Sequence, residues 1–329
     1  MTDAIERRIR EWNDEEMNEV NQMLQVLEQH LYREYLPTKI NGPNFWRRLD
    51  AWLGNVEKQD SKWAKRMFKF STELFFVGSK ESEEAMRYSY QVIAHRWLSD
   101  QVGCSLLESD GARRLQTAVE RSWFLPVTDS LDINRYHHLN RIPHSIGNRT
   151  NLHAAKEGDD CQGIARQSRR HGIEHIVLVE DFVASGSQAA KAILSLMRAI
   201  PGMPILFAPL VVCPAGDDYL NRLSRTYLQF HYEPVLRISR DTLITEEIDQ
   251  SIDKERASIR EIAEKTYDDV SDGRPPGPEA PYHPLGFPAN NPTGGVTVLF
   301  SNTPDNTLPM IHHESRKWTP LFVRDSRKV

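Results

Sequence analysis

The sequence has few cysteines and no pattern among them. Cys104, Cys161 and Cys213 are far apart and odd in number, and no two cysteines have the C-x-x-C spacing. This excludes a disulfide framework and a zinc knuckle built on cysteine pairs, and it favours a reducing compartment.

Long apolar runs and an excess of positive charge are also missing. The longest apolar runs, such as Ile205–Cys213, are far shorter than the roughly 20 residues that a membrane helix needs. The first residues are charged and contain no apolar signal core. The formal net charge is −5, so there is no sequence-wide basic footprint for nucleic acid. We expect a soluble, cytoplasmic protein with no membrane partner.

What is present suffices for a substantial core. Hydrophobic residues make up 39% of the 329 residues, and charged residues 26%, which fits one large domain or two ordinary ones. Residues 1–115 are predicted to be helical. Trp63–Phe76 and Glu81–Asp100 are expected to be two of the helices, the second with one face formed by Ala85, Tyr88, Val92 and Trp97. A helical scaffold with an aromatic core is the main interpretation, and a partner-binding surface is the alternative.

The pattern changes after Gly111. Short apolar segments now alternate with helix-forming sequence, which predicts an α/β fold with a parallel sheet over residues 116–270. The predicted strands are Trp123–Val127, Ile176–Val179, Ile205–Cys213 and, as a fourth candidate, Val235–Ile238. Thr245 is a plausible N-cap for a charged helix that extends to about Asp269.

The last part of the chain begins with a linker. Residues 271–295 contain 7 prolines and 5 glycines, which is typical of a loop and not of a core element. Residues 296–329 then contain a strand, Val296–Phe300, and an apolar tail that we expect to be docked.

Two acids and a turn of small residues follow the second predicted strand. Ile176–Val179 leads directly into Glu180 and Asp181, and Ser185-Gly-Ser187 comes before a helix that is predicted to start near Gln188. Open α/β sheets bind ligands at the carboxyl ends of their strands. Small residues let the backbone approach an anion, which the free N–H groups and the helix dipole can then hold.

The spacing of this segment fits a sugar phosphate. A single ribose 5-phosphate can place its hydroxyls against Glu180 and Asp181 and its phosphate in the turn four to six residues later. A purely structural turn is the alternative. Other nucleotide sites are not indicated, because the sequence has neither G-x-x-x-x-G-K-[ST] nor G-x-G-x-x-G.

Residues 176–188 resemble the phosphoribosyl pyrophosphate (PRPP) signature of type I phosphoribosyltransferases. The resemblance implies that Glu180 and Asp181 contact the ribose hydroxyls and that Ala184, Ser185, Gly186, Ser187 and Gln188 hold the 5′-phosphate. It also implies Mg²⁺, bound chiefly through the ligand. Two departures stand out: Gln188 replaces the usual final threonine, and Ala184 stands where purine salvage enzymes often have an aspartate. The second departure argues against ordinary purine salvage.

The same resemblance implies a turn and a loop that hold pyrophosphate. Thr128, Asp129 and Ser130 follow the first predicted strand and are the candidates for the turn, with a helix N-cap as the alternative. Arg149 and Lys156 lie in the interval of the family's mobile loop, where cations could neutralise pyrophosphate; a solvated loop is the alternative.

A hood made from a chain end covers the base in that family. Asn302, Asn306 and His312 are candidates to read a base edge, or else they satisfy turn backbone. Two other polar pairs favour structural roles. His137-His138 has poor geometry for joint metal binding, and Asp217-Asp218 opens a helix, where acids are usually caps.

The whole chain most closely resembles phosphoribosyltransferase-like proteins of bacterial defence or conflict operons, including retron-associated ones. That resemblance implies a role as an anti-phage effector and operon-encoded partners, such as an ATPase or a complex of reverse transcriptase and noncoding RNA. A homo-oligomer is a further option. Three functions stay open: an enzyme that transfers phosphoribose or cleaves a nucleotide glycosidic bond, a PRPP or nucleotide sensor without turnover, and a scaffold.

Overall fold

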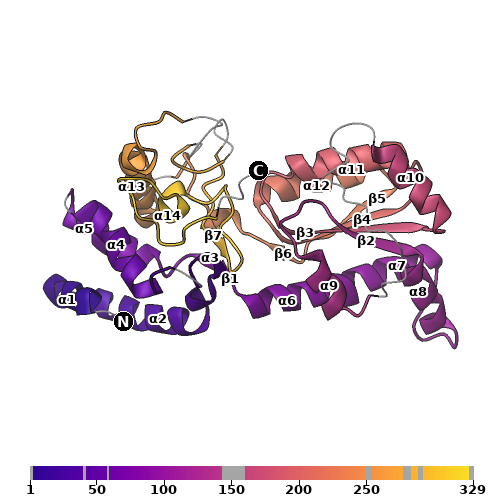
Figure 1. Ribbon diagram of the computed structural model, residues 1–329, viewed down its shortest axis with the longest axis horizontal. Helices are drawn as coiled ribbons and strands as arrows, with labels where there is room; N and C mark the ends of the chain where they lie inside the picture. Colours follow the sequence, from indigo (N-terminus) through magenta and orange to yellow (C-terminus); the bar gives the residue numbers. More distant parts are fainter. Residues whose placement is uncertain are drawn as a thin grey trace. The chain divides into compact units, whose positions relative to one another are not determined.

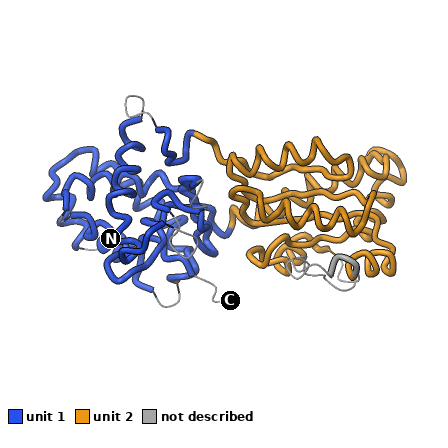
Figure 2. Tube along the Cα trace, turned by 90° about the horizontal axis from the view of Figure 1, so that it is seen from above, with its two compact units in different colours: residues 1–79, 241–329 blue, residues 80–240 orange. Residues whose placement is uncertain are grey.

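The chain forms two compact units. The computed structural model describes residues 3–39, 42–57, 59–142, 160–248, 253–276, 283–287 and 292–325. Unit 1 combines residues 1–79 with residues 241–329, and unit 2 is residues 80–240 (Figure 2). These bounds differ from the divisions at 115, 270 and 295 drawn from the sequence, because the chain leaves unit 1, builds the parallel sheet and then returns.

Unit 2 is an α/β sandwich. Its helices are α6 (Ser79–Tyr88), a π-helical segment (Ser89–Ala94), α7 (His95–Val102), α8 (Gly111–Glu120), α9 (Ile133–Leu139), α10 (Asp160–Arg170), α11 (Ser187–Ala199) and α12 (Pro214–Thr226). Its strands are β2 (Ser122–Pro126), β3 (His175–Val183), β4 (Ile205–Val212), β5 (Phe230–Tyr232) and β6 (Leu236–Arg237).

The sheet of unit 2 is entirely parallel. The strand order is β2-β3-β4-β5, and β6 pairs with the far end of β4. The predicted α/β class with a parallel sheet is therefore confirmed. The three longer strands were predicted near their observed bounds, whereas β5 was missed because Phe230–Tyr232 is too short to show a pattern.

Alternation along the strands gives the sheet two covered faces. Trp123, Ile176, Leu178 and Phe207 pack in one core with α10, α11 and α12, which lie on the same side in Figure 1. Residues of the opposite face meet the π-helical segment and α7: the rings of Tyr90 and Phe124 are 5.4 Å apart, and those of Trp97 and His175 5.8 Å.

The predicted face of Glu81–Asp100 was wrong. Ala85 and Trp97 are buried, but Tyr88 is 48% exposed and Val92 is 38% exposed. The π-helical turns of Ser89–Ala94 widen the helix and shift the phase of its side chains, so that Tyr90 and Ile93 face the sheet instead.

Unit 1 is mostly helical. Its elements are α1 (Asp3–Trp12), α2 (Glu15–His30), α3 (Leu36–Lys39), α4 (Phe45–Glu57), α5 (Ser61–Phe70), α13 (Lys254–Val270), α14 (Pro309–His312), 3₁₀ turns at Tyr32–Glu34 and Arg240–Thr242, and the strands β1 (Phe75–Val77) and β7 (Thr297–Leu299). β1 and β7 form a parallel pair, Phe75 opposite Thr297. Every described helix of the protein is too short or too polar to cross a bilayer.

The core of unit 1 joins the two ends of the chain. Phe322 contacts the rings of Tyr32, Tyr35, Phe45 and Phe76 at centroid distances of 5.1–6.1 Å. The expected docking of the apolar tail is thus confirmed.

Two helix predictions in unit 1 were wrong. The helix expected over Trp63–Phe76 ends at Phe70, and the aromatic residues after it form β1. Thr245 is not an N-cap: α13 starts at Lys254, where the Asp253 carboxylate accepts a hydrogen bond from the Arg256 N–H. An apolar pattern alone did not distinguish a helix end from a short strand.

Candidate functional site

Strand β3 carries the two acids inside its ladder. The predicted strand stopped at Val179, but β3 continues to Val183 because Phe182 and Val183 pair with Val211 and Val212 of β4. Glu180 is therefore in the strand and only 4% exposed, whereas Asp181 is half-buried. The acids differ in environment as well as position.

The turn after β3 leads directly into α11. Gly186 has φ +76°, a left-handed conformation that favours glycine, and it is the N-cap position of the helix. Ser187 and Gln188 are exposed, and the Ser185 and Ser187 hydroxyl oxygens are 3.0 Å apart. The first-turn N–H groups of a helix have no acceptor within the helix, so this end can hold an anion.

A second glycine lets α12 approach this turn. A Cβ on Gly216 would lie 2.6 Å from the Ala184 carbonyl oxygen, and one on Gly186 would lie 3.4 Å from the Gly216 Cα. Backbone packs on backbone here, which fixes the turn, while Ser187 stays exposed.

The loop after β2 is attached to the acids. The ladder continues through the bond from the Val127 N–H to the Val179 carbonyl, and this brings Thr128 within hydrogen-bond reach of the Glu180 side chain. The Thr128 N–H donates to Glu180 Oε2 at 2.8 Å, and the Thr128 hydroxyl contacts Glu180 Oε1. The Ser130 hydroxyl lies 2.6 Å from both Glu180 Oε1 and Asp181 Oδ1.

Burial dominates the electrostatics of Glu180. Loss of solvent, followed by the nearby charge of Asp181, raises the pKa of Glu180 to about 7, although the hydrogen bonds from Ser130 and Thr128 act in the opposite direction. The glutamate therefore holds its proton far more readily than a carboxyl in water.

The described part of the site unites two sets of predicted residues. Glu180, Asp181 and the Ala184–Gln188 turn are continuous along β3 and α11. Thr128 and Ser130 bond to the acids, and Asp129 lies between them on the surface. Arg149 and Lys156 lie outside the described residues.

The hood candidates lie in the other unit and are engaged with backbone. The Asn302 amide donates to the Asp325 carbonyl at 2.9 Å and accepts from the Asp325 N–H. Asn306 is fully buried. His312 Nε2 donates to the Thr307 carbonyl at 3.1 Å, and burial lowers the pKa of His312 to about 3, so its ring is neutral.

The remaining polar pairs have structural partners. His137 is buried, with Nε2 3.1 Å from the Phe124 carbonyl oxygen, while His138 is exposed, so they do not act together. Asp217 accepts from the Tyr232 hydroxyl and from Arg237, and Asp218 pairs with Arg240. Sequence reasoning missed these arginines. Arg237 is paired with Asp217, the neighbour of Gly216, and its only sequence signal is its place in a short strand.

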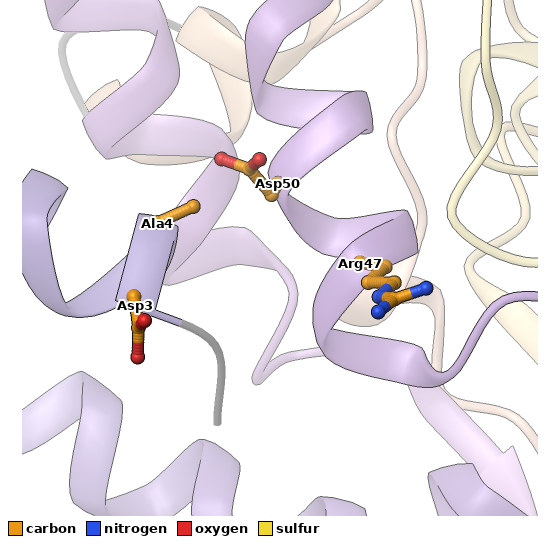
Figure 3. Close-up of a pocket in the computed structure, with 4 residues that line it drawn as sticks. All are labelled: Asp3, Ala4, Arg47 and Asp50. Atoms are coloured by element: carbon orange, nitrogen blue, oxygen red, sulfur yellow. The ribbon is translucent and has the colours of Figure 1, made fainter.

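A separate pocket lies on unit 1. It is lined by Asp3, Ala4, Arg47 and Asp50, which come from α1 and α4 (Figure 3). Asp50 already accepts a 2.7 Å bond from Arg8, and the pocket lies in a different unit from Glu180 and the α11 turn. We assign the functional site to the acids and the turn, because they bring together groups with complementary chemistry.

In this parallel sheet, β3 carries two acids, and a turn with a left-handed glycine connects it to α11. This arrangement is that of a phosphoribosyltransferase-like protein. The family model PRTase-CE matches residues 49–324, and the chain therefore belongs to the PRTase-CE family. The match extends from α4 to the tail and so includes most of unit 1. No curated protein and no solved structure matches the chain.

Proposed function

We propose that unit 2 binds a ribosyl 5′-phosphate, either PRPP or a nucleotide, with the phosphate in the Ser185–Gln188 turn and the sugar hydroxyls at the acids. One observation carries this proposal: β3 places a half-buried carboxylate, Asp181, four residues before the Ser185–Gln188 turn, whose Ser187 and Gln188 are exposed at the start of a 13-residue helix. A carboxylate accepts hydroxyl protons, and the helix start attracts phosphate.

Such a site supports chemistry at the anomeric carbon. In a transfer reaction the bond from C1 to the leaving oxygen or base breaks as the bond to the acceptor forms, and positive charge develops on the sugar. Asp181 and the neighbouring Glu180 stabilise that charge without acting as nucleophiles.

Mg²⁺ is part of this proposal for a ligand that carries a diphosphate. Among the described residues, no three His, Cys, Asp or Glu side chains lie together as a metal site. Asp181 and the ligand's own phosphates are the groups that fit the ion, since Mg²⁺ favours few carboxylates plus phosphates. When bound, the ion would neutralise charge on the leaving diphosphate.

A binding module without turnover is the second candidate. Ala184 offers no acid at the position where related enzymes often have one, and Glu180 bonds to the Thr128–Ser130 loop in preference to solvent. A sensor needs the ribose and phosphate contacts but no acid–base group.

The resemblance to proteins of defence operons supports a cellular role for either candidate. We propose that the protein acts in bacterial anti-phage defence, as effector or sensor, together with operon-encoded proteins. Cells that express the protein should plate phage less efficiently only when the partners are present, and their PRPP or nucleotide pools should change if it is an enzyme.

The direct test uses the pure, full-length protein. We expect saturable binding of ribosyl 5′-phosphates by calorimetry, and we expect the double variant Glu180→Gln, Asp181→Asn to lose it. Mass spectrometry of PRPP and nucleotides incubated with the protein separates turnover from binding alone.

The matched control removes two exposed acids of the same unit, Glu120→Gln with Glu174→Gln, and should bind normally. Circular dichroism checks that both variants fold. Unchanged binding by the Glu180, Asp181 variant would place the site elsewhere.

A further inference from the structure

Three hydrogen-bond donors of the loop that would hold a diphosphate already contact the two acids. One backbone N–H and two hydroxyls, those of Thr128 and Ser130, all contact the carboxylates of Glu180 and Asp181. A diphosphate that bound to these three donors would have to displace carboxylate oxygens.

That displacement is unfavourable for two physical reasons. Glu180 is 4% exposed, so removing its donors leaves a buried carboxyl group unsatisfied. A diphosphate would also bring negative charge next to Asp181 and to the exposed Asp129. The turn at Ser185–Gln188 is separate from this loop, so a 5′-monophosphate meets neither obstacle.

The number of hydroxyl protons limits the hydrogen bonds between the loop and the acids. The Thr128 and Ser130 hydroxyls, Glu180 Oε1 and Asp181 Oδ1 are linked by four short oxygen–oxygen contacts. The two hydroxyls supply only two protons, since each has one. At most two of the four contacts therefore carry a proton from the loop hydroxyls, and the Thr128 N–H adds a separate bond to Glu180.

We propose that this site is selective for ribosyl 5′-monophosphates whose C1 carries no phosphate. We also propose that Glu180 is a positioning residue that holds the Thr128–Ser130 loop through its hydrogen bonds, a contact that we call the latch. This inference rests on the proposed function, because it specifies the ligand of the same site, the acids and the Ser185–Gln188 turn. Asp181 is the acid that meets the ribose hydroxyls. The ligand class comprises ribose 5-phosphate and nucleoside 5′-monophosphates, which differ only in the base.

The test compares probes on the full-length protein by calorimetry. Ribose 5-phosphate, each of the four nucleoside 5′-monophosphates and PRPP with Mg²⁺ are titrated separately. We expect the best monophosphate to bind at least tenfold more tightly than PRPP. Tighter binding of ribose 5-phosphate than of every nucleotide would identify the sugar phosphate as the ligand, and the reverse would identify a nucleotide.

Two substitutions of Glu180 then distinguish a role in holding the loop from a merely structural role. Glu180→Gln keeps a side-chain oxygen that can still accept from Thr128, so the ratio of PRPP affinity to ribose 5-phosphate affinity should stay within about threefold of the wild-type ratio. Glu180→Ala releases the loop donors, so the ratio of PRPP affinity to ribose 5-phosphate affinity should rise at least tenfold. A merely structural role would weaken both ligands equally.

The outcomes are distinguishable from failure of the proposed function. If no ribosyl phosphate binds the wild-type protein, both proposals fall. If PRPP binds more tightly than every monophosphate, or if the affinity ratio is the same in Glu180→Ala, the latch is overturned while the phosphoribosyl site stands. Asp181→Asn should lose all binding in every case where the site is correct.

Discussion

A set of buried donors in unit 1 and the acids of unit 2 differ in their hydrogen-bond partners. In unit 1 three buried donors bond to backbone: Trp52 and Trp318 both donate to the Met310 carbonyl, and the Tyr35 hydroxyl donates to the Val323 carbonyl. In unit 2 the buried Glu180 is joined to Asp181 through hydroxyls, beside an exposed turn. Groups attached to backbone stabilise one structure, whereas groups shared between acids can change protonation and partners. The comparison indicates that these buried groups of unit 1 stabilise the fold, whereas the acids of unit 2 belong to the candidate functional site.

The largest expected effect is in the aromatic core. Trp318→Ala removes a side chain that is 1% exposed, and such deletions cost about 3–5 kcal/mol. Unit 1 should become sensitive to protease at lower urea, as read from mass spectrometry of the peptides. Trp63→Ala, a partly buried residue of the same unit, is the graded control and should cost less. Equal effects would contradict the assigned core.

The second effect concerns the acids of unit 2. Folding raises the pKa of Glu180 from 4.5 to about 7, so the folded state favours the protonated form. The protonated Glu180 therefore contributes fully to the stability of unit 2 below pH 4.5, and this contribution is lost as the pH rises through about 7. The full loss is at most about 3 kcal/mol.

Urea unfolding of unit 2 at several pH values measures this slope. Glu180→Gln should flatten it, because the amide does not titrate. A slope that persists in that variant would mean that another group controls the pH dependence.

Unit 1 should respond to pH with the opposite sign. Burial, aided by the charge of Arg324, lowers the pKa of His312 from 6.5 to about 3. The folded state then binds fewer protons than the unfolded state, so stability is lost as the pH falls below 6.5. Between pH 7 and pH 5 the loss should be about 2 kcal/mol. His312→Gln should weaken this dependence, and stability of unit 1 that stays constant down to pH 4 would refute it.

The last prediction compares the effect on stability of replacing two glycines, Gly216 and Gly54, by alanine. Gly216→Ala places a Cβ 2.6 Å from the Ala184 carbonyl oxygen, so it should destabilise unit 2 by about 1–3 kcal/mol and weaken phosphate binding. Gly54→Ala, inside α4 and with only the Arg8 side chain within 4 Å, should stabilise unit 1 by up to about 1 kcal/mol. Thermal unfolding and ribose 5-phosphate titration of both variants provide the comparison. Normal binding by Gly216→Ala would show that the packing of α12 does not shape the turn.

Local patterns were enough to predict the centre of unit 2. Apolar runs predicted β2, β3 and β4, and the small residues at 185–187 marked the turn before α11. The contact between Glu180 and the Thr128–Ser130 loop was not predictable, because it depends on the register between β2 and β3, which brings Thr128 within hydrogen-bond reach of the Glu180 side chain. The pairing of β1 with β7 was missed for the same reason: Phe75 and Thr297 are far apart in the chain, and nothing local encodes their contact.

The central claim is that a ribosyl 5′-phosphate occupies the space between Asp181 and the start of α11. Hydrogen exchange of the full-length protein, with and without saturating ribose 5-phosphate, tests it at single-segment resolution. We predict slower exchange of the amides of residues 184–190, and little change in α4 or α13 of unit 1. Unaltered exchange across 184–190 at a saturating concentration would contradict the account.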